Sequence, residues 1–312
     1  DEGGGGGRSR GSGAHPGGGA GARGSLQAPR WGSCAQGRSA VGVSLASDPN
    51  EQHRPYMEDG HKVVDPLLST RDETWGLYAV FDGHGGREET TYCELKMHDV
   101  VAAELRNLAL GRDVREALVA AFKKIDGQLA MLGAWNSGCT ATVALVYRHA
   151  GGTSKLYVAN VGDSRAVLVG SSGWRRVSVD HRACDPAEAK RVAADGGMVR
   201  HGRVGGQLSV SRSLGDHHLK NSGVSCVPDV FACDLPLGEN TLVIASDGLW
   251  DVMEDDLAAE LIHEAINGAA AQAAGGQKNI VDLLQANCAR SLITYAKEHG
   301  TRDNILALVV FL

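Results

Sequence analysis

The chain has 312 residues, of which 43% are hydrophobic and 22% are charged, the composition of a soluble globular protein with a core of ordinary size. At about 100–200 residues per domain, this length allows one large domain or two small ones. The net charge is −6 and the 31 lysines and arginines are scattered, which argues against the concentrated basic face that nucleic-acid binding needs.

The chain opens with a glycine-rich segment. Twelve of its first 25 residues are Gly, mixed with Ser, Ala and Arg. Such a segment buries almost no apolar surface to offset its chain entropy. We therefore expect a disordered tail over residues 1–38 and a folded domain over residues 39–312.

After the tail, short runs rich in apolar and β-branched residues predict β-strands, because each is bounded by turn-forming residues. The turn Gly162-Asp163-Ser164 between two of these runs predicts a hairpin over residues 156–169. The predicted strands cover residues 75–81, 140–147, 155–161, 166–169, 241–245 and 305–312.

Apolar residues at intervals of three or four predict helices elsewhere. A short helix should begin at Pro186, because proline favours the first helical position, and end at Gly196. Regular β-α-β alternation is missing, so antiparallel sheets with helices on their faces are favoured over a doubly wound parallel sheet. The longer predicted helices cover residues 86–108, 114–132, 254–266 and 280–295.

The seven cysteines are odd in number, widely spaced and without a C-x-x-C pair. This pattern favours reduced thiols over a disulfide framework or a zinc site, and hence an intracellular protein, cytoplasmic or nuclear. Loss of a targeting segment stays open, because the chain starts without Met. No apolar run reaches the ~18 residues of a transmembrane span.

Three carboxylates lie beside the most hydrophobic predicted strands. Asp82 ends WGLYAVFDG, Asp247 ends TLVIASDG and Asp303 precedes NILALVVF. A single Asp-Gly is usually a turn, but a carboxylate just past a buried strand is fixed in place at a solvent-accessible end. Three such groups predict a shared cation site.

Glu58 and Asp59 add negative charge in the segment RPYMEDGH. Gathered carboxylates repel one another unless they bind protons or cations. A set of oxygen ligands without a histidine cluster favours Mg²⁺ or Mn²⁺ over Zn²⁺. Two such ions about 4 Å apart can deprotonate a water and stabilise attack on phosphorus.

Seven motifs, in order along residues 40–312, closely resemble those of the type 2C protein phosphatase family. They are RPYMEDGH, FDGHGG, SGCTA, NVGDSR, GQLSVSRSLGD, SDGLWD and RDN. The resemblance implies an α+β fold, a four-layer α-β-β-α sandwich of two antiparallel sheets flanked by helix pairs. It also implies a metal-dependent phosphatase that acts on phosphoserine and phosphothreonine in proteins.

The resemblance also implies a metal-ligand set of two Mg²⁺ or Mn²⁺ ions. Asp82 would bridge both ions and Gly83 would contribute its backbone carbonyl. Asp247 and Asp303 would hold the second ion. The residues that would act largely through metal-bound water are Glu58 and Asp59.

Two further roles follow from the same resemblance. Arg54 would bind the substrate phosphate and His84 would protonate the leaving alkoxide. Asp163 and Asp251 match positions linked to a weaker third metal or to outer support. Residues 180–206 resemble the family's flap beside the active site, where substrate preference is set.

Three functions stay open on the residues alone. The first is an active protein phosphatase, monomeric, acting on phosphorylated proteins. The second is a catalytically dead scaffold of the same fold, which is disfavoured because Asp82, Asp247 and Asp303 are all acidic. The third is a hydrolase of small phosphoesters. Cys139 is interpreted as a buried small hydrophobe, because no tyrosine-phosphatase arrangement surrounds it.

Overall fold

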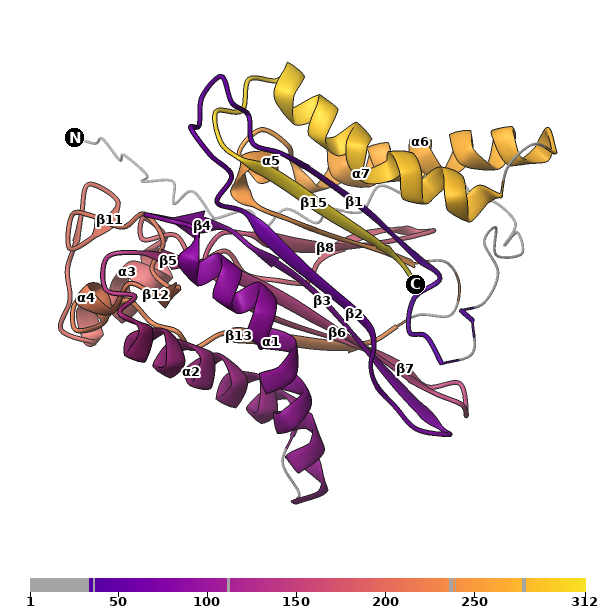
Figure 1. Cartoon of the computed structure of the whole chain (residues 1–312). Helices are drawn as coiled ribbons and strands as arrows, with labels where there is room; N and C mark the ends of the chain where they lie inside the picture. The colour runs from indigo at the N-terminus through magenta and orange to yellow at the C-terminus, as the bar shows by residue number, and fades with distance from the viewer. Residues whose placement is uncertain (1–33, 36, 111–112, 236–237, 239, 277–278) are drawn as a thin grey trace, which may run out of the picture.

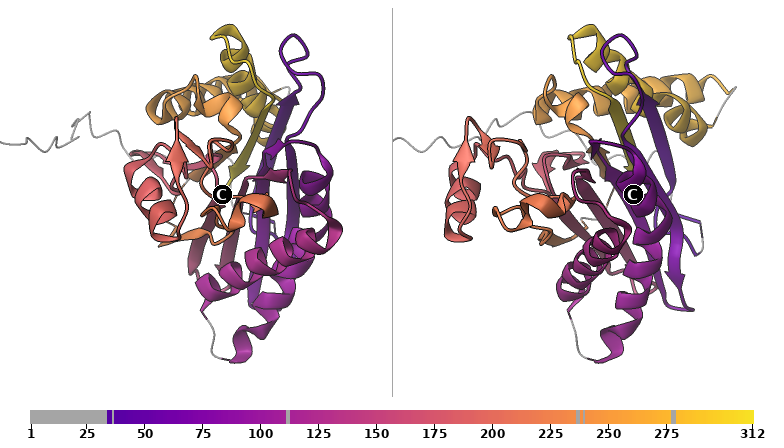
Figure 2. Two further views of the ribbon diagram at one scale, coloured as in Figure 1. Left: turned by 90° about the vertical axis from the view of Figure 1, so that its left-hand side faces the viewer. Right: turned by 60° about the vertical axis from the view of Figure 1, so that its left-hand side comes forward.

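The computed structural model describes residues 34–35, 37–110, 113–235, 238, 240–276 and 279–312. Two five-stranded antiparallel sheets stack face to face, and a pair of long helices covers each outer face (Figure 1; Figure 2). The expected four-layer sandwich is thus confirmed. The predicted tail falls almost wholly outside the described residues, so its boundary at residue 38 stays a prediction.

The first sheet takes strands from both ends of the chain, and the second is built from residues 60–234. In order, the first sheet comprises β1 (Gly42–Asp48), β15 (Ile305–Phe311), β14 (Asn240–Ala245), β8 (Arg165–Gly170) and β9 (Gly173–Arg176). The second comprises β13 (Asp229–Asp234), β7 (Ser154–Val161), β6 (Ala141–His149), β3 (Glu73–Phe81) and β2 (Gly60–Ser69). The last strand in sequence therefore pairs with the first, in antiparallel register.

The central strands are apolar on both faces because both faces are covered. In β3, Leu77, Ala79 and Phe81 pack under the helices, while Tyr78 and Val80 pack against the other sheet. This follows from the two-residue repeat of a strand. It also explains why these strands read as continuous apolar runs in the sequence.

The helix pairs are α1 (Glu88–Arg106) with α2 (Val114–Leu132), and α6 (Asp255–Ala274) with α7 (Ile280–Glu298). The first pair packs on the second sheet and the second pair on the first sheet. Asp113 caps α2, since its side chain accepts a hydrogen bond from the backbone N–H of Arg115. A single turn, η1 (Asn107–Leu110), follows α1. All four helices were predicted, although α6 extends past the predicted end at residue 266.

A long connection between β9 and β13, residues 177–228, forms a small subdomain at one end of the sandwich, at the left of Figure 1. It has its own apolar core, which includes Val192, Val204 and Leu219. Its regular elements are α3 (Pro186–Ala194), β10 (Val199–Arg200), β11 (Arg203–Val204), β12 (Leu214–Gly215) and α4 (His217–Lys220). The predicted helix start at Pro186 is confirmed, and Asp185 caps it.

The predicted hairpin over residues 156–169 is wrong. Strand β7 lies in the second sheet and β8 in the first, so the chain crosses between the sheets at Gly162 and Asp163. Gly162 has a φ of +93°, and the Asn160 side-chain amide donates to its carbonyl oxygen. Glycine and aspartate are found both in hairpin turns and in connections between sheets. These turn residues therefore do not show whether the flanking strands pair with each other.

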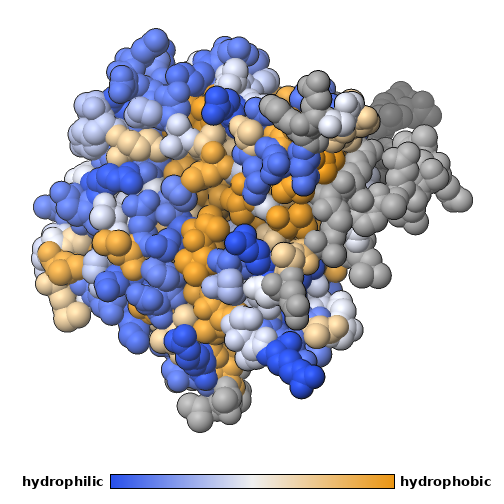
Figure 3. Space-filling view, turned by 45° about the vertical axis from the view of Figure 1, so that its right-hand side comes forward, coloured by the Kyte–Doolittle hydropathy of each residue, from blue (hydrophilic) through white to orange (hydrophobic). Residues whose placement is uncertain are grey.

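Two other expectations concern the surface and the thiols. All seven cysteines are free, and Cys139 is fully buried as predicted. None of the helices in the described part of the chain could cross a membrane. Figure 3, which brings the right-hand side of Figure 1 forward, shows a band of hydrophobic residues between hydrophilic regions.

Candidate metal centre and active site

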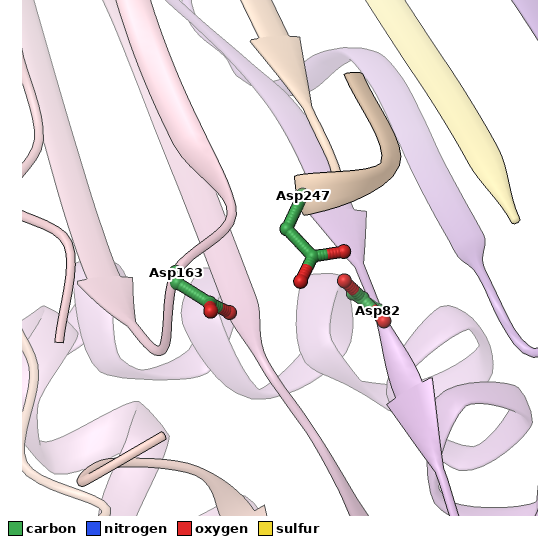
Figure 4. Close-up of side chains that lie close together, drawn as sticks. All are labelled: Asp82, Asp163 and Asp247. Atoms are coloured by element: carbon green, nitrogen blue, oxygen red, sulfur yellow. The ribbon is translucent and has the colours of Figure 1, made fainter. Parts of the chain in front are cut away.

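Three aspartates meet where the two sheets come together. Asp82 follows β3 of the second sheet, and Asp247 begins α5 (Asp247–Trp250) directly after β14 of the first. Asp163 lies at the crossing between the sheets. One carboxylate oxygen of each lies within 4.8 Å of the other two, and Figure 4 shows the three side chains directed toward one another.

The backbone around these aspartates is fixed by short contacts. The Thr140 N–H donates to the Asp82 carbonyl oxygen at 2.8 Å, and the Asp82 N–H donates to Thr140 Oγ1 at 3.2 Å. A Cβ at Gly248 would lie 1.9 Å from the Asn304 carbonyl oxygen. The glycine after Asp247 therefore allows α5 to start against the chain that enters β15.

The electrostatics of the cluster favour a cation. Burial raises the pKa of Asp82 well above its usual range, and the charges of Asp59, Asp247 and Asp163 raise it further. Burial likewise raises the pKa of Asp163 to about 6, although the Arg182 guanidinium lowers it. Carboxylates that are costly to ionise next to one another bind a divalent cation readily. The oxygen-only donor set fits Mg²⁺ or Mn²⁺.

Asp303 is not among the three aspartates whose carboxylate oxygens lie within 4.8 Å of one another. Its carboxylate pairs with the Arg54 guanidinium, and its charge contributes to the raised pKa of Asp82 and Asp247. Both Asp303 and Arg54 line the same pocket as the three aspartates. The structure thus gathers Asp163 most closely with Asp82 and Asp247, and sets Asp303 beside the predicted phosphate-binding arginine.

Glu58 and Asp59 are buried behind the cluster. Glu58 Oε1 accepts a hydrogen bond from the Gly86 N–H at 2.8 Å, so it holds the glycine-rich loop after Asp82. Asp59 Oδ2 accepts from the Ser246 hydroxyl at 2.6 Å. Burial nevertheless raises the pKa of Asp59 to about 7.

Gly83 and Asp251, two further predicted ligands, have different surroundings. Gly83 lines the pocket, and a Cβ there would lie 2.7 Å from the Glu58 carbonyl oxygen. The Asp251 carboxylate is more than half exposed and pairs with Arg182, whose Nε lies 3.3 Å from Asp163 Oδ2. Arg182 was not singled out from the sequence, because an isolated arginine carries no motif.

The pocket over the aspartates has a volume of about 520 Å³. His84 belongs to β4 (Gly83–His84), and its Nε2 lies 2.7 Å from Asp216 Oδ2. Burial lowers the pKa of His84, but the hydrogen bond and charge of Asp216 outweigh burial and raise it above its usual value. From the β9–β13 connection, the pocket also receives Arg203, Gln207 and His218. These were not predicted as site residues.

This geometry combines clustered acidic oxygens, an arginine and a histidine around one polar pocket. Such a set can hold divalent cations, bind a phosphate and move a proton. Among the described residues that line the pocket there is no cysteine, so a covalent cysteine intermediate has no support here.

Comparison with known proteins agrees with this chemistry. The family model described as Protein phosphatase 2C matches residues 44–305. The chain is 36% identical to Protein phosphatase 2C homolog 1 of Saccharomyces cerevisiae, across 86% of this chain and 93% of that protein. It is 30% identical to the integrin-linked kinase-associated serine/threonine phosphatase 2C of Bos taurus, across 82% of this chain and 73% of that protein.

Solved structures share the fold. A phosphatase from a pathogenic strain of Toxoplasma gondii superposes with a TM-score of 0.69 at 22% identity, over 86% of this chain and 91% of that one. A Caenorhabditis elegans sex-determining protein gives 0.72 at 21% identity, over 86% of this chain and 64% of that one.

Proposed function

The chain belongs to the protein phosphatase 2C family, and from this premise we propose how its side chains hydrolyse phosphoserine and phosphothreonine esters in proteins. As a member of that family it is a metal-dependent serine/threonine phosphatase. The observation that carries the proposal is the meeting of the Asp82, Asp163 and Asp247 carboxylates, within 4.8 Å, on the floor of one pocket.

We propose that two Mg²⁺ or Mn²⁺ ions bind at this cluster. Bound there, they would supply an acidified water for attack on phosphorus and offset the charge of the phosphate. Asp82, Asp163 and Asp247 would hold them most directly. The further oxygen donors would be the Gly83 carbonyl, Asp251, Asp303 and, through water, Glu58 and Asp59.

Arg54 would bind the substrate phosphate. Arg54 lines the pocket and its side chain is 39% exposed, so a phosphate can reach it. A planar guanidinium donates two parallel hydrogen bonds to a phosphate, which an ammonium group cannot reproduce. The pairing with Asp303 keeps the arginine directed at the pocket before a substrate arrives.

His84 would act as the general acid. It lines the same pocket two residues after Asp82, within reach of a phosphate ester held over the aspartates. By donating a proton to the leaving serine or threonine oxygen, it would spare the release of a free alkoxide. The alternative of a catalytically dead scaffold is disfavoured, because none of the acidic positions of the motifs has been replaced.

We also propose that the protein acts inside the cell, cytoplasmic or nuclear, as a monomer on phosphorylated proteins. The seven unpaired thiols support the reducing compartment.

The test is phosphate release from phosphoserine, phosphothreonine and phosphotyrosine peptides with Mg²⁺, Mn²⁺ or a chelator. We expect activity on the first two peptides, and its loss with chelator. His84→Ala should lower kcat on a phosphoserine peptide by about 10²–10⁴-fold, and much less on p-nitrophenyl phosphate, whose phenolate leaves without protonation. Activity in chelator, or equal losses on both substrates, would contradict the proposal.

A further inference from the structure

His84 contacts a carboxylate to which no role has yet been given. Its Nε2 lies 2.7 Å from Oδ2 of Asp216, the last residue of the motif GQLSVSRSLGD. The Asp216 side chain is 2% exposed, whereas that of His84 is 30% exposed. His84 lies in β4 and Asp216 directly follows β12, and β5 (Gly138–Cys139) lies between these two strands in the small sheet β12-β5-β4.

Asp216 is held firmly in place. Its backbone N–H donates to the Ser137 carbonyl oxygen at 2.8 Å, and its Oδ2 accepts from the Ser213 hydroxyl at 2.6 Å. A Cβ at Gly138 would lie 2.3 Å from Asp216 Oδ2, so a glycine is needed there. Asp216 itself has a φ of +50°, a left-handed conformation that aspartate tolerates better than most residues. The carboxylate is therefore in position before any substrate binds.

This arrangement fixes which nitrogen of His84 carries a proton. Burial raises the pKa of Asp216, but the hydrogen bond and charge of His84, the Ser213 hydroxyl and the charge of Lys220 lower it below its usual value. An ionised carboxylate only accepts hydrogen bonds, so Nε2 must be the donor. Nδ1 makes no hydrogen bond with any described residue of the chain, which leaves it for the substrate.

We propose that Asp216 is a positioning residue, which accepts the Nε2–H of the His84 imidazolium and thereby directs Nδ1–H at the leaving group; after Nδ1 gives up its proton, the neutral ring keeps the proton on Nε2. This inference rests on the proposed general-acid role of His84. An aspartate that fixes the tautomer and ring orientation of a catalytic histidine is an established physical device.

Asp126 offers a matched control. It is also a buried carboxylate, and its Oδ1 accepts from the Gly215 N–H at 3.0 Å and from Lys220 Nζ at 3.1 Å. It therefore supports the same stretch of chain as Asp216 but has no contact with His84. A purely structural role of Asp216 would make the two carboxylates equivalent in kinetic tests.

The experiment compares kcat and KM at saturating Mg²⁺ on a phosphoserine peptide and on p-nitrophenyl phosphate. Asp216→Ala should lower kcat on the peptide at least about tenfold, with little change on the aryl phosphate and in KM. Asp216→Asn keeps the shape and one acceptor oxygen, so its loss should be intermediate. Asp126→Asn should leave the ratio of the two kcat values unchanged.

The double variant His84→Ala with Asp216→Ala should be no slower on the peptide than His84→Ala, because the carboxylate acts only through the histidine. Ring ¹⁵N chemical shifts of His84 should report a proton on Nε2 in the wild type and a mixture of tautomers in Asp216→Ala. Equal losses on both substrates, additive losses or an unchanged tautomer would overturn the inference. A His84→Ala variant with no dependence on the leaving group would instead overturn the general-acid role itself.

Discussion

Two groups of carboxylates in the described part of the chain are shielded from solvent, but their surroundings differ. At the end of the sandwich, Asp82 and Asp247 face other aspartates, and burial with mutual repulsion raises both pKa values. In the β9–β13 connection, Glu188 accepts hydrogen bonds from Arg212 at 2.7 Å and from Arg191 at 3.0 Å. Burial opposes ionisation there too, but these partners bring the pKa of Glu188 to about 2.

The arginine network also ties the connection to the second sheet. Arg212 Nη1 lies 2.8 Å from Oδ1 of Asp229, which begins β13, and His181 Nε2 lies 3.2 Å from Asp229 Oδ2. A buried carboxylate can stay ionised when the protein places a positively charged group beside it. Buried carboxylates that face only one another need a bound cation to stay ionised. Glu188 and Asp229 are therefore expected to stabilise the fold, whereas Asp82 and Asp247 are suited to binding cations.

The largest effect should come from replacing Asp82 or Asp247, the carboxylates that face other aspartates, with an uncharged residue. Asp82→Asn or Asp247→Asn should lower kcat by several orders of magnitude, because each removes a ligand charge. Neither should destabilise the metal-free protein, since repulsion is relieved. The measurements are kcat on a phosphopeptide and thermal unfolding with and without Mn²⁺. We expect Mn²⁺ to raise the Tm of the wild type and to have much less effect on the variants. Full activity in either variant would sink the two-metal proposal.

The paired group should respond in the opposite way. Glu188→Gln removes the one carboxylate that Arg212 and Arg191 share, although each arginine keeps a further partner, Asp229 or Asp195. The free energy of unfolding should therefore fall by about 3 kcal/mol, at the low end of the range for a broken buried pair. Glu260→Gln, at an exposed position of α6, is the control and should stay within about 0.5 kcal/mol. Denaturant unfolding measures both. Equal stability of the two variants would show that the network contributes nothing.

The two groups should also give opposite pH dependence in the metal-free protein. Glu188 has a lowered pKa, so its contribution to the free energy of unfolding is present above pH 4.5 and is lost as the pH falls toward about 2. The loss should be roughly 3 kcal/mol. Asp59 has a raised pKa, so its contribution to the free energy of unfolding is present below pH 3.8 and is lost as the pH rises through about 7. The free energy of unfolding against pH measures both effects. Mg²⁺ should abolish the second and leave the first, and any other pattern contradicts the assignment.

The smallest effect should come from the glycine-rich start, since neither group of carboxylates includes a residue before position 39. The Ser39 N–H donates to Asp65 Oδ1 at 2.8 Å, and the Ser39 hydroxyl lies 2.8 Å from that of Tyr78. Deletion of residues 1–38 should leave Tm and peptide dephosphorylation nearly unchanged. A drop in Tm of ~5 °C or more, or roughly 1.5–3 kcal/mol, would show that the tail packs on the domain.

Much of this architecture could be predicted from the sequence. The spacing of apolar residues indicates the buried face of each helix or strand, and turn-forming residues indicate where it ends. Positions that depend on distant contacts could not. The crossing at Gly162 reads as a hairpin, since apolar strands on either side look alike whether they pair or join different sheets. Asp163 joins the aspartate cluster because of that crossing. Asp216 contacts His84 because β12 pairs with β5. No local sequence pattern predicts this pairing.

The exchange of edge strands between the two sheets has a consequence for how the protein can be divided. Strand β1 belongs with β14 and β15, and β13 belongs with β2, β3, β6 and β7, so each half of the chain completes the sheet of the other. Asp82 comes from one half and Asp247 from the other. Cleavage between β7 and β8 would leave two pieces, each with an unfinished sheet and part of the reactive centre. Separately expressed halves should be inert and recover function only when they are folded together.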